Sequence, residues 1–381
     1  MFVFGTRPEA IKMAPLVIEF RKHPTLFQTS VCVTGQHRQM LDQVLRVFGI
    51  VPEYDLNIMN SAQDLYDTTT RILSGMKDVL DDISPDLVFV HGDTTSTLAA
   101  GLAAFYRKIP VAHVEAGLRT YNLYNPWPEE INRSLTDRIA AYHFAPTPSS
   151  KKNLIDENIR EENILVTGNT AIDALQWALK IISDDSEKEK EIVTYLTNEG
   201  YDINRLRIER KMILITGHRR ENFGESIQQI CYAIKNLSLS FPEVDFVYPV
   251  HLNPNVLRPV KSILGEGIKN RNIFLTGPLD YLPFIYLVSK SFLVLTDSGG
   301  LQEEAPWLGK PVLVMREVTE RNEAMESGTA ILVGTASEQI EQSVIRLLTD
   351  HRIYESMSKF NNPFGDGKAS ERIVGFVKNL T

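Results

Sequence analysis

Cysteine is scarce in this chain of 381 residues, and its scarcity excludes one class of protein. Cys32 and Cys231 are the only two, they are far apart, and each lies in an apolar segment. They cannot form the disulfide framework of a small secreted domain, and they form no CxxC pair. We therefore expect free thiols, a reducing compartment and a cytoplasmic location.

Long apolar runs and an excess of positive charge are also missing. No segment approaches the roughly 20 apolar residues of a membrane span. The apolar run at residues 1–4 is too short for a signal peptide, and Arg7 follows almost at once. A net charge of −8 argues against nucleic acid or an anionic membrane as the partner. An anionic small molecule still fits, because a local basic cluster can lie on an acidic protein.

Short apolar segments alternate with longer amphipathic ones, which is typical of parallel α/β sheets. Hydrophobic residues make up 43% of the chain, enough for two cores. We expect strands at 2–4, 29–35, 86–92, 111–117, 142–147, 211–217, 245–251, 273–277, 292–297, 311–315 and 330–334. In the first half we expect helices at 10–23, 38–48, 64–83 and 95–108. A charge-dense stretch at 183–191 separates the two halves.

The two halves begin alike, with FVFGTRPEA at residue 2 and LITGHRRE at residue 214. This symmetry indicates two similar Rossmann-type domains that face each other across a cleft, where ligands usually bind. The segment SERIVGFVKNL, residues 370–380, has the pattern of one amphipathic helix.

The strand at 292–297 ends at Ser298-Gly299-Gly300, and a helix with Glu304 in its first turn follows. Such a turn presents backbone N–H groups and the positive end of a helix, which suits phosphate. A carboxylate one turn later suits a ribose hydroxyl. An ordinary βα turn with a capping serine fits the same residues.

Charged side chains also follow the strands of the first half. Arg7 lies at a βα turn with Lys12 one helical turn later, which suits an anion; the alternative is a solvated helix surface. Residues two apart on a strand share a face, so His91 pairs with Asp93 and His113 pairs with Glu115. We expect both acids to line a shared site, although Asp93 also fits a helix cap, and we expect both histidines to be core residues.

Three further groups add acid and base chemistry. Glu129 and Glu130 start a helix after two prolines, and one of them is expected only to complement the helix dipole. His218 follows the strand at 211–217 beside two arginines and fits a general acid/base or a phosphate ligand. Arg321 lies in another loop after a strand. The pattern indicates acid/base work on a nucleotide-linked substrate.

Many longer motifs, in order along the chain, resemble one family. They are GTRPEAIKMAP, GQHRQMLDQV, HGDTTSTLA, HVEAGLRT, PWPEEINR, TGNTAIDAL, TGHRREN, YPVHLNPNV, TDSGGLQEEAP, LGKPVLVM and NPFGDGKAS. The chain is similar throughout to the non-hydrolysing bacterial UDP-N-acetylglucosamine 2-epimerases. The resemblance implies two Rossmann-like domains in the glycosyltransferase-B arrangement, with the active site in the interdomain cleft. The implied domains are residues 1–168 with helix 364–381, and residues 169–363.

The resemblance also implies an activity and its residues. The activity is reversible conversion of UDP-GlcNAc to UDP-ManNAc by a homodimer, without metal or redox cofactor, as a step towards surface polysaccharide. The implied catalytic residues are Asp93, Glu115, Glu129 and His218. The implied substrate contacts are Arg7, Lys12, Leu279, Phe284, Ser298, Gly299, Gly300, Glu304 and Arg321. A second, activating UDP-GlcNAc site would use Gln36, Gln39, Gln63, Arg219 and His251.

Two positions depart from the family pattern, and several rival functions remain. Asn322 stands where TERPE has proline, which we expect to loosen the loop of Arg321, and Trp307 stands where a small residue is usual. The rivals are a hydrolysing epimerase, a UDP-sugar glycosyltransferase, a non-catalytic UDP-sugar sensor and a metal-dependent hydrolase built on the two histidine–acid pairs.

Overall fold

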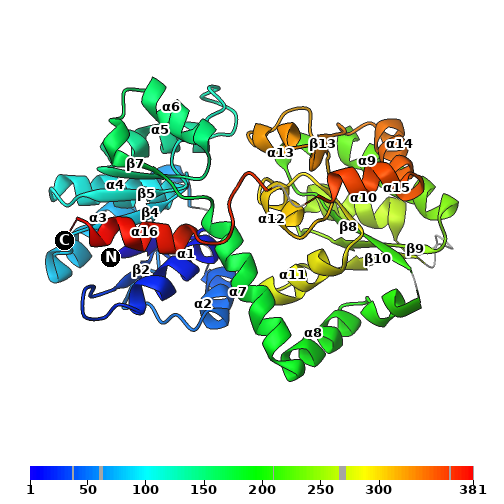
Figure 1. Ribbon diagram of the computed structural model, residues 1–381, viewed down its shortest axis with the longest axis horizontal. Helices are drawn as coiled ribbons and strands as arrows, with labels where there is room; N and C mark the ends of the chain where they lie inside the picture. Colours follow the sequence, from blue (N-terminus) through cyan, green and yellow to red (C-terminus); the bar gives the residue numbers. More distant parts are fainter. Residues whose placement is uncertain (37, 60–62, 209, 266–271, 360–361, 381) are drawn as a thin grey trace. The chain divides into compact units, whose positions relative to one another are not determined.

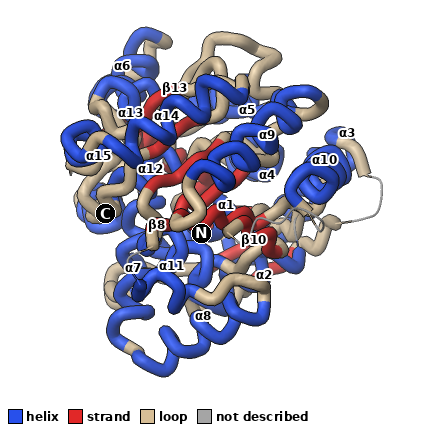
Figure 2. The backbone as a smooth tube through the Cα atoms, turned by 90° about the vertical axis from the view of Figure 1, so that its right-hand side faces the viewer, coloured by secondary structure: helices blue, strands red, loops and turns tan. Residues whose placement is uncertain are grey.

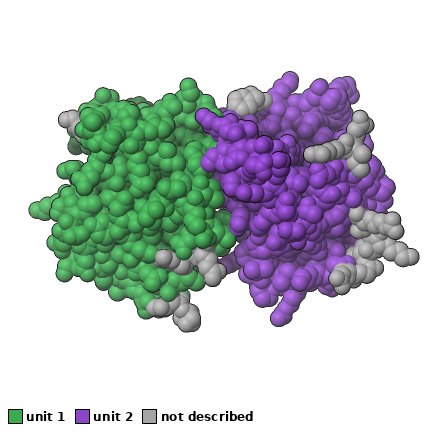
Figure 3. Space-filling model, turned by 90° about the horizontal axis from the view of Figure 1, so that it is seen from below, with its two compact units in different colours: residues 1–177, 364–381 green, residues 178–363 purple. Residues whose placement is uncertain are grey.

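The computed structural model describes residues 1–36, 38–59, 63–208, 210–265, 272–359 and 362–380. The chain folds into two compact units, which Figure 3 colours separately. Unit 1 comprises Met1–Trp177 and Phe364–Thr381, and unit 2 comprises Ala178–Pro363. Helix α7 (Thr170–Asp184) continues from the first unit into the second. None of the helices in the described ranges combines the length and apolarity needed to span a bilayer.

Unit 1 is built on a parallel sheet of seven strands, in the order β3-β2-β1-β4-β5-β6-β7. The strands are β1 (Phe2–Phe4), β2 (Val31–Val33), β3 (Tyr54–Asp55), β4 (Val88–His91), β5 (Val111–Val114), β6 (Tyr142–Ala145) and β7 (Ile164–Val166). All the residues of β1, β2, β4 and β5 are buried, as expected for parallel strands covered by helices on both faces. The strand order reverses between β1 and β4, which is where ligands bind in open α/β sheets.

Helices surround the strands, as the colours of Figure 2 show. Those of unit 1 are α1 (Arg7–Arg21), α2 (Arg38–Val47), α3 (Leu65–Ile83), α4 (Thr95–Tyr106), α5 (Glu129–Ile139), α6 (Pro148–Asp156), the 3-10 helix η1 (Glu161–Asn163) and α16 (Ala369–Lys378). A capping box starts α1: the Thr6 hydroxyl accepts from the Glu9 N–H, and the Glu9 carboxylate accepts from the Thr6 N–H at 2.7 Å. This cap fixes the turn that carries Arg7.

The last helix belongs to unit 1. Helix α16, red in Figure 1, packs against α1, which is blue. The ring of Phe376 meets the rings of Tyr142 and Phe144 edge-on, with centroids 5.6 Å away in both cases. The buried carboxylate of Asp173 accepts the backbone N–H groups of Ala369 and Ser370, which start α16. Residues 364–380 therefore complete the first unit.

Unit 2 repeats the same strand order in a parallel sheet of six strands, β10-β9-β8-β11-β12-β13. The strands are β8 (Lys211–Thr216), β9 (Val244–Pro249), β10 (Ile273–Thr276), β11 (Leu293–Thr296), β12 (Val312–Val314) and β13 (Ala330–Leu332). The helices are α8 (Ser186–Asn198), η2 (Ile203–Ile208), η3 (Arg220–Asn222), α9 (Glu225–Ser240), α10 (Pro254–Leu264), α11 (Tyr281–Lys290), α12 (Leu301–Trp307), α13 (Asn322–Glu326), α14 (Ser337–Thr349) and α15 (His351–Met357). Its order reverses between β8 and β11.

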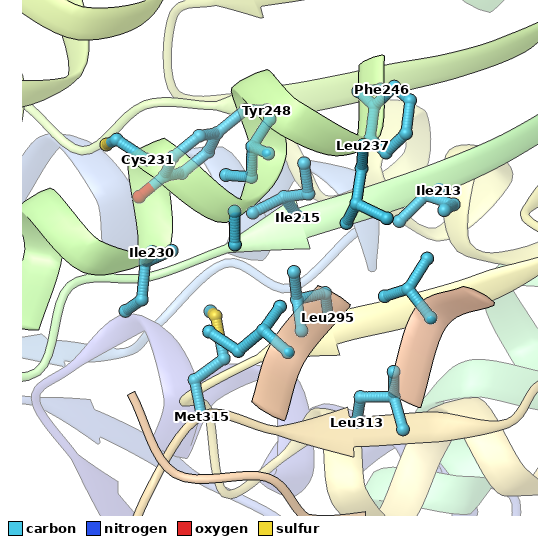
Figure 4. Packing of buried hydrophobic residues seen from close by; sticks show 14 of the residues in the cluster. Ile213, Ile215, Ile230, Cys231, Leu237, Phe246, Tyr248, Leu295, Leu313 and Met315 are labelled. Atoms are coloured by element: carbon cyan, nitrogen blue, oxygen red, sulfur yellow. The ribbon is translucent and has the colours of Figure 1, made fainter. Parts of the chain in front are cut away.

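Close packing holds the second sheet in place. Side chains from β8, β9, β11 and β12 point toward one another and toward Ile230 and Leu237 of α9 (Figure 4). Ile213, Ile215 and Leu313 have no exposed surface, and burying such a side chain contributes about 1.5–3 kcal/mol. Packing in this core holds β8 and β11 side by side, and with them the loops that follow their carboxyl ends.

The predicted two-domain α/β fold is confirmed, with two kinds of local difference. Two short strands, β3 and β7, were not predicted; both are at edges of the sheet, and each has three residues or fewer. The charge-dense stretch at 183–191, expected to be a break between the halves, lies in the end of α7 and in α8. The domain boundary at 168/169 stays a prediction.

Candidate active site

Polar side chains gather where the strands of unit 1 reverse order. Arg7 is the first residue of α1, directly after the turn that follows β1, and Lys12 is one turn further along. Asp93 comes two residues after β4, and Glu115 comes directly after β5. The carboxyl ends of β1, β4 and β5 therefore place these four charged groups on one edge of the sheet.

Glu115 is held by two other elements. Its Oε2 atom is contacted by the ammonium group of Lys12 and accepts a hydrogen bond from Asn169 Nδ2 at 2.6 Å. The residue is 9% exposed, and its φ angle of 65° lies in the left-handed region that side chains other than glycine rarely adopt. Backbone strain of this kind clusters at functional sites. Glu115 is thus a buried, oriented carboxylate paired with a cation.

Asp93 is oriented from α5. The guanidinium of Arg133 donates to its Oδ2 atom, and Asn132 Nδ2 donates to its backbone carbonyl at 2.9 Å. The alternative of a helix cap is wrong, because Thr94 caps α4 and accepts from the Thr97 N–H at 3.1 Å. The carboxylate of Asp93 is therefore not used to cap α4 and lies at the sheet edge, oriented by Arg133.

The two histidines are buried, as predicted. His113 is fully enclosed, with Nδ1 2.5 Å from Asp137 Oδ1 and Nε2 2.7 Å from the carbonyl oxygen of Gly92. His91 differs, because its Nε2 makes no hydrogen bond within the described residues and lies 3.9 Å from Glu115 Oε2. Burial lowers the pKa of His91 to about 4, so the ring that lies against Glu115 is neutral at pH 7.

The adjacent acids at the start of α5 have different environments. Glu130 is 1% exposed, and its Oε1 atom accepts the backbone N–H groups of Thr120 and Tyr121 at 2.9 and 2.8 Å. It therefore holds the preceding loop. Glu129, the first residue of α5, is partly exposed. The expectation that one of the two acids only complements the helix dipole stays a prediction.

The strand reversal of unit 2 is organised by Asp297, a residue that the sequence analysis missed. Asp297 follows β11 and has no exposed surface. Its Oδ2 atom accepts three hydrogen bonds, from the N–H groups of His218 and Arg219, both at 2.9 Å, and from Asn222 Nδ2 at 3.1 Å. In the sequence, Asp297 could have been recognised only as an acid that follows an apolar strand, which is the pattern that identified Asp93.

The side chain of His218 lies over this carboxylate. Its Nδ1 is 3.5 Å from Asp297 Oδ1, and its ring stacks on that of His251 with centroids 5.6 Å apart. The His218 side chain is 46% exposed, and its partial desolvation lowers its pKa; Asp297 opposes this effect, whereas Arg219 and His251 add to it. The imidazole is thus a group whose charge responds to a nearby anion.

The glycine turn after β11 is crowded. A Cβ atom at Gly299 would lie 3.2 Å from both Arg321 Cζ and Glu320 Oε1. Gly300, and not Ser298, is the residue that precedes α12, so the alternative of a capping serine is wrong. Without a side chain at 299, the Arg321 guanidinium can lie directly against the turn.

Arg321 is buried among carboxylates. Its Nε donates to Glu303 Oε1 at 2.9 Å, and its Nη1 donates to Glu320 Oε1 at 2.6 Å. Although burial opposes ionisation, the guanidinium groups of Arg321 and then Arg316 hold the pKa of Glu320 well below its usual range. Asn322 is the exposed first residue of α13, and the ion pairs form beside it, so Arg321 stays anchored. Trp307 ends α12 and is partly buried.

The remaining predicted residues lie in both units. Leu279 is buried just before α11, Phe284 lies in the first half of α11, and Glu304 lies in the first turn of α12. In unit 1, Gln36 accepts from Ser96 Oγ at 3.0 Å, and Gln63 donates to Thr68 Oγ1 at 2.8 Å.

The other three residues predicted for the activating UDP-GlcNAc site are Arg219, His251 and Gln39. In unit 2, Arg219 Nη2 is 3.6 Å from Glu320 Oε1, and His251 Nδ1 accepts from the Asn253 N–H at 3.1 Å. Gln39 lies in α2, but its side chain is outside the described part of the structure. Side-chain partners were therefore found for four of the five residues assigned to this site.

Proteins similar to this chain in sequence and fold include several UDP-N-acetylglucosamine 2-epimerases. The family model described as UDP-N-acetylglucosamine 2-epimerase matches residues 19–378. The chain belongs to this family. The UDP-N-acetylglucosamine 2-epimerase of Salmonella typhimurium is 55% identical over 377 residues, which cover 99% of this chain and 97% of the relative. The predicted membership of the UDP-N-acetylglucosamine 2-epimerase family is therefore confirmed.

Solved structures of the family agree. A UDP-GlcNAc 2-epimerase from Neisseria meningitidis, bound to UDP-GlcNAc, has a TM-score of 0.91 and 51% identity, and 99% of each chain is covered. The S. aureus MnaA–UDP co-structure has a TM-score of 0.88 and 44% identity, and it covers 100% of this chain and 96% of the other. The two parallel α/β units found here are thus the fold of the UDP-N-acetylglucosamine 2-epimerases.

Proposed function

We propose that this member of the UDP-N-acetylglucosamine 2-epimerase family inverts C2 of UDP-GlcNAc reversibly, giving UDP-ManNAc, by eliminating UDP and adding it back. Family membership over almost the whole chain supports the reaction. The observation that carries the chemistry is the buried Glu115 carboxylate, fixed by Lys12 and Asn169 at the ligand-binding edge of its sheet.

The substrate dictates an elimination. The hydrogen at C2 is not acidic by itself, because no carbonyl group is adjacent. When UDP leaves C1 while a base removes that proton, a 2-acetamidoglucal forms. A proton returned to the opposite face of C2, with UDP added back at C1, gives the epimer. The sugar therefore needs proton-transfer groups on both faces.

The cluster of unit 1 is suited to these proton transfers. Glu115, Asp93 and Glu129 are the carboxylates that we assign to them. Lys12 keeps Glu115 in place, and Arg133 does the same for Asp93. These two contacts hold the Glu115 and Asp93 carboxylates at the strand ends, where the reaction needs proton-transfer groups.

The cluster of unit 2 is suited to the departing UDP. We assign the diphosphate to Ser298, Gly299 and Gly300, with the positive charge of Arg321 directly against Gly299. His218, once protonated, and Arg7 would share the charge that develops as UDP leaves. Leu279 and Phe284 are assigned to uracil and Glu304 to the ribose. The relatives from Neisseria and S. aureus are bound to UDP-GlcNAc and UDP, which supports a nucleotide site in this chain.

Three wider assignments follow from the same family. We place the enzyme in the cytoplasm as a homodimer that supplies a precursor of surface polysaccharide; both of its cysteines are free and buried. We also assign UDP-GlcNAc an activating role at Gln36, Gln39, Gln63, Arg219 and His251. Light scattering tests the dimer, and rates measured on UDP-ManNAc with added UDP-GlcNAc test the activation.

The decisive experiment is proton NMR of the purified protein with UDP-GlcNAc in heavy water, without added metal. We expect deuterium at C2 and the appearance of UDP-ManNAc. Free ManNAc with UDP would indicate a hydrolysing epimerase instead. Bound but unchanged substrate would indicate a sensor or, if an acceptor sugar restores turnover, a transferase. Loss of activity in EDTA, restored by metal, would indicate a metal-dependent hydrolase.

A further inference from the structure

The two oxygens of the Asp297 carboxylate have unequal environments. Oδ2 accepts three hydrogen bonds, two from the backbone of His218 and Arg219 and one from Asn222. Oδ1 is equally buried but accepts no hydrogen bond from any described residue. A buried carboxylate oxygen without a donor is costly, so an open oxygen of this kind calls for an explanation.

A titratable imidazole lies beside the open oxygen. His218 Nδ1 is 3.5 Å from Oδ1, long for a hydrogen bond but within reach of an ion pair. Catalytic hydrogen bonds are often long before a ligand binds and shorten in the complex. The three bonds to Oδ2 fix the loop that carries His218, and they leave Oδ1 directed at the ring.

We propose that Asp297 is a positioning residue that holds His218 with its Nδ1–H toward Oδ1 and stabilises the imidazolium as UDP departs. In this arrangement Nε2 is the nitrogen that faces substrate. When Nε2 carries a proton, the ring offers that N–H and a positive charge to the leaving diphosphate, while Asp297 balances the charge from behind. This inference rests on the proposed role of His218 in the release of UDP.

The charges around the His218 ring predict the direction in which its pKa moves when Asp297 is replaced. Arg219 and His251 both disfavour the protonated ring, as the loss of solvent around it does, and within the described part of the chain Asp297 is the charge that favours that form. Removal of the Asp297 charge should therefore lower the pKa of His218 further. If protonated His218 is the active form, activity is lost as pH rises through its pKa. The alkaline limb of the kcat profile then moves to lower pH.

The test compares Asp297→Asn with the wild-type enzyme. We expect kcat to fall on the order of 100-fold or more, as when the acid behind a catalytic histidine is made neutral, with KM changed much less. We also expect the titration of the His218 ring, followed by NMR on histidine-labelled full-length protein, to move to lower pH. An unchanged His218 titration and an unchanged pH limb would overturn the proposal and leave Asp297 as an anchor of the loop.

Tyr248→Phe is the matched control. The Tyr248 hydroxyl donates to the carbonyl oxygen of Gly217 at 3.2 Å, so the variant removes another buried contact of the same loop without changing any charge. It should leave the His218 titration in place. A shift in Tyr248→Phe equal to that in Asp297→Asn would overturn the electrostatic part of the proposal.

Two further measurements separate the possible failures. His218→Gln should nearly abolish turnover; if it does not, the assigned role of His218 fails, while the titration without substrate still tests the Asp297–His218 pair. If Asp297→Asn does not fold, the nitrogen shifts of wild-type His218 decide. A neutral ring protonated at Nδ1 supports the proposal, and one protonated at Nε2 overturns it.

Discussion

The ammonium group of Lys12 contacts the carboxylate of Glu115, although 103 residues separate them in the chain. Lys12 belongs to the first helix and Glu115 to the end of β5, so one ion pair ties together two of the three strand ends that form the unit 1 cluster. Its side chains are 12% and 7% exposed, which makes each partner costly to bury alone.

Replacement of Lys12 by methionine should therefore lower both stability and activity. A buried ion pair that loses one partner typically costs about 3–5 kcal/mol. The urea unfolding midpoint and deuterium incorporation at C2 measure the two effects. The double variant Lys12→Met with Glu115→Gln should regain much of the stability, because no lone charge is left buried, but no activity. Full activity of Lys12→Met would contradict this account of Glu115.

The two acids that start α5 should separate into one catalytic and one structural residue. Glu130→Ala leaves two partly buried backbone N–H groups without their acceptor, at a cost of about 1 kcal/mol for each because water can reach them. It should lower the unfolding midpoint markedly. Glu129→Gln should keep that midpoint and lose turnover, on the order of 100-fold or more for a lost acid/base group. If Glu129→Gln lowered the unfolding midpoint and Glu130→Ala lost only turnover, Glu130 would be the catalytic acid and Glu129 the structural one.

Gly299→Ala should weaken UDP binding. The new Cβ would lie 3.2 Å from Arg321 Cζ and from Glu320 Oε1, so the buried ion pair or the turn must move. At Gly300 the nearest atom to a new Cβ is Ser298 Oγ at 4.0 Å, and Gly300→Ala should therefore weaken binding less. Calorimetric titration of both variants with UDP measures the difference. Equal losses would show that the space beside Arg321 is not what matters.

His91 should make stability depend on pH below neutrality. Its pKa is lowered to about 4 in the folded protein, against about 6.5 unfolded, so the unfolded chain binds the extra proton between these values. This contribution is complete above pH 6.5 and is lost as pH falls toward 4, in all about 3 kcal/mol. Urea midpoints of wild type and His91→Gln across this range measure it. The wild-type midpoint should fall relative to that of His91→Gln as pH falls from about 6.5 toward 4, and parallel curves would refute the assignment.

Strand positions were largely predictable from the sequence, because parallel strands buried on both faces are short apolar runs. The exceptions, β3 and β7, have only two and three residues and lie at the edges, where fewer side chains need to be apolar. The charge-dense residues 183–191 looked like a linker, yet Asp185 caps α8 there and most of the charges face solvent.

The site was predictable only in part. Asp93, Glu115 and His218 stand at strand ends, and that position alone marks them. Their partners Arg133 and Asn169 lie on elements that only the folded chain brings near; Glu115 and Asn169, for example, are 54 positions apart in the sequence. Asp297 was missed for a related reason. Its hydrogen bonds come from the backbone N–H groups of His218 and Arg219, and only the folded chain brings these groups to it.

The packing of α16 on α1 has a consequence for synthesis on the ribosome. Unit 2, residues 178–363, is one continuous stretch and can acquire all its contacts as soon as it has emerged. Unit 1 was made first, yet it must wait for residues 364–380 before Phe376 can cover Tyr142 and Phe144. The nascent first half therefore carries an uncovered apolar face until residues 364–380 have been made, and truncation or a tag fused near α16 should damage unit 1, whose other segments are translated before unit 2.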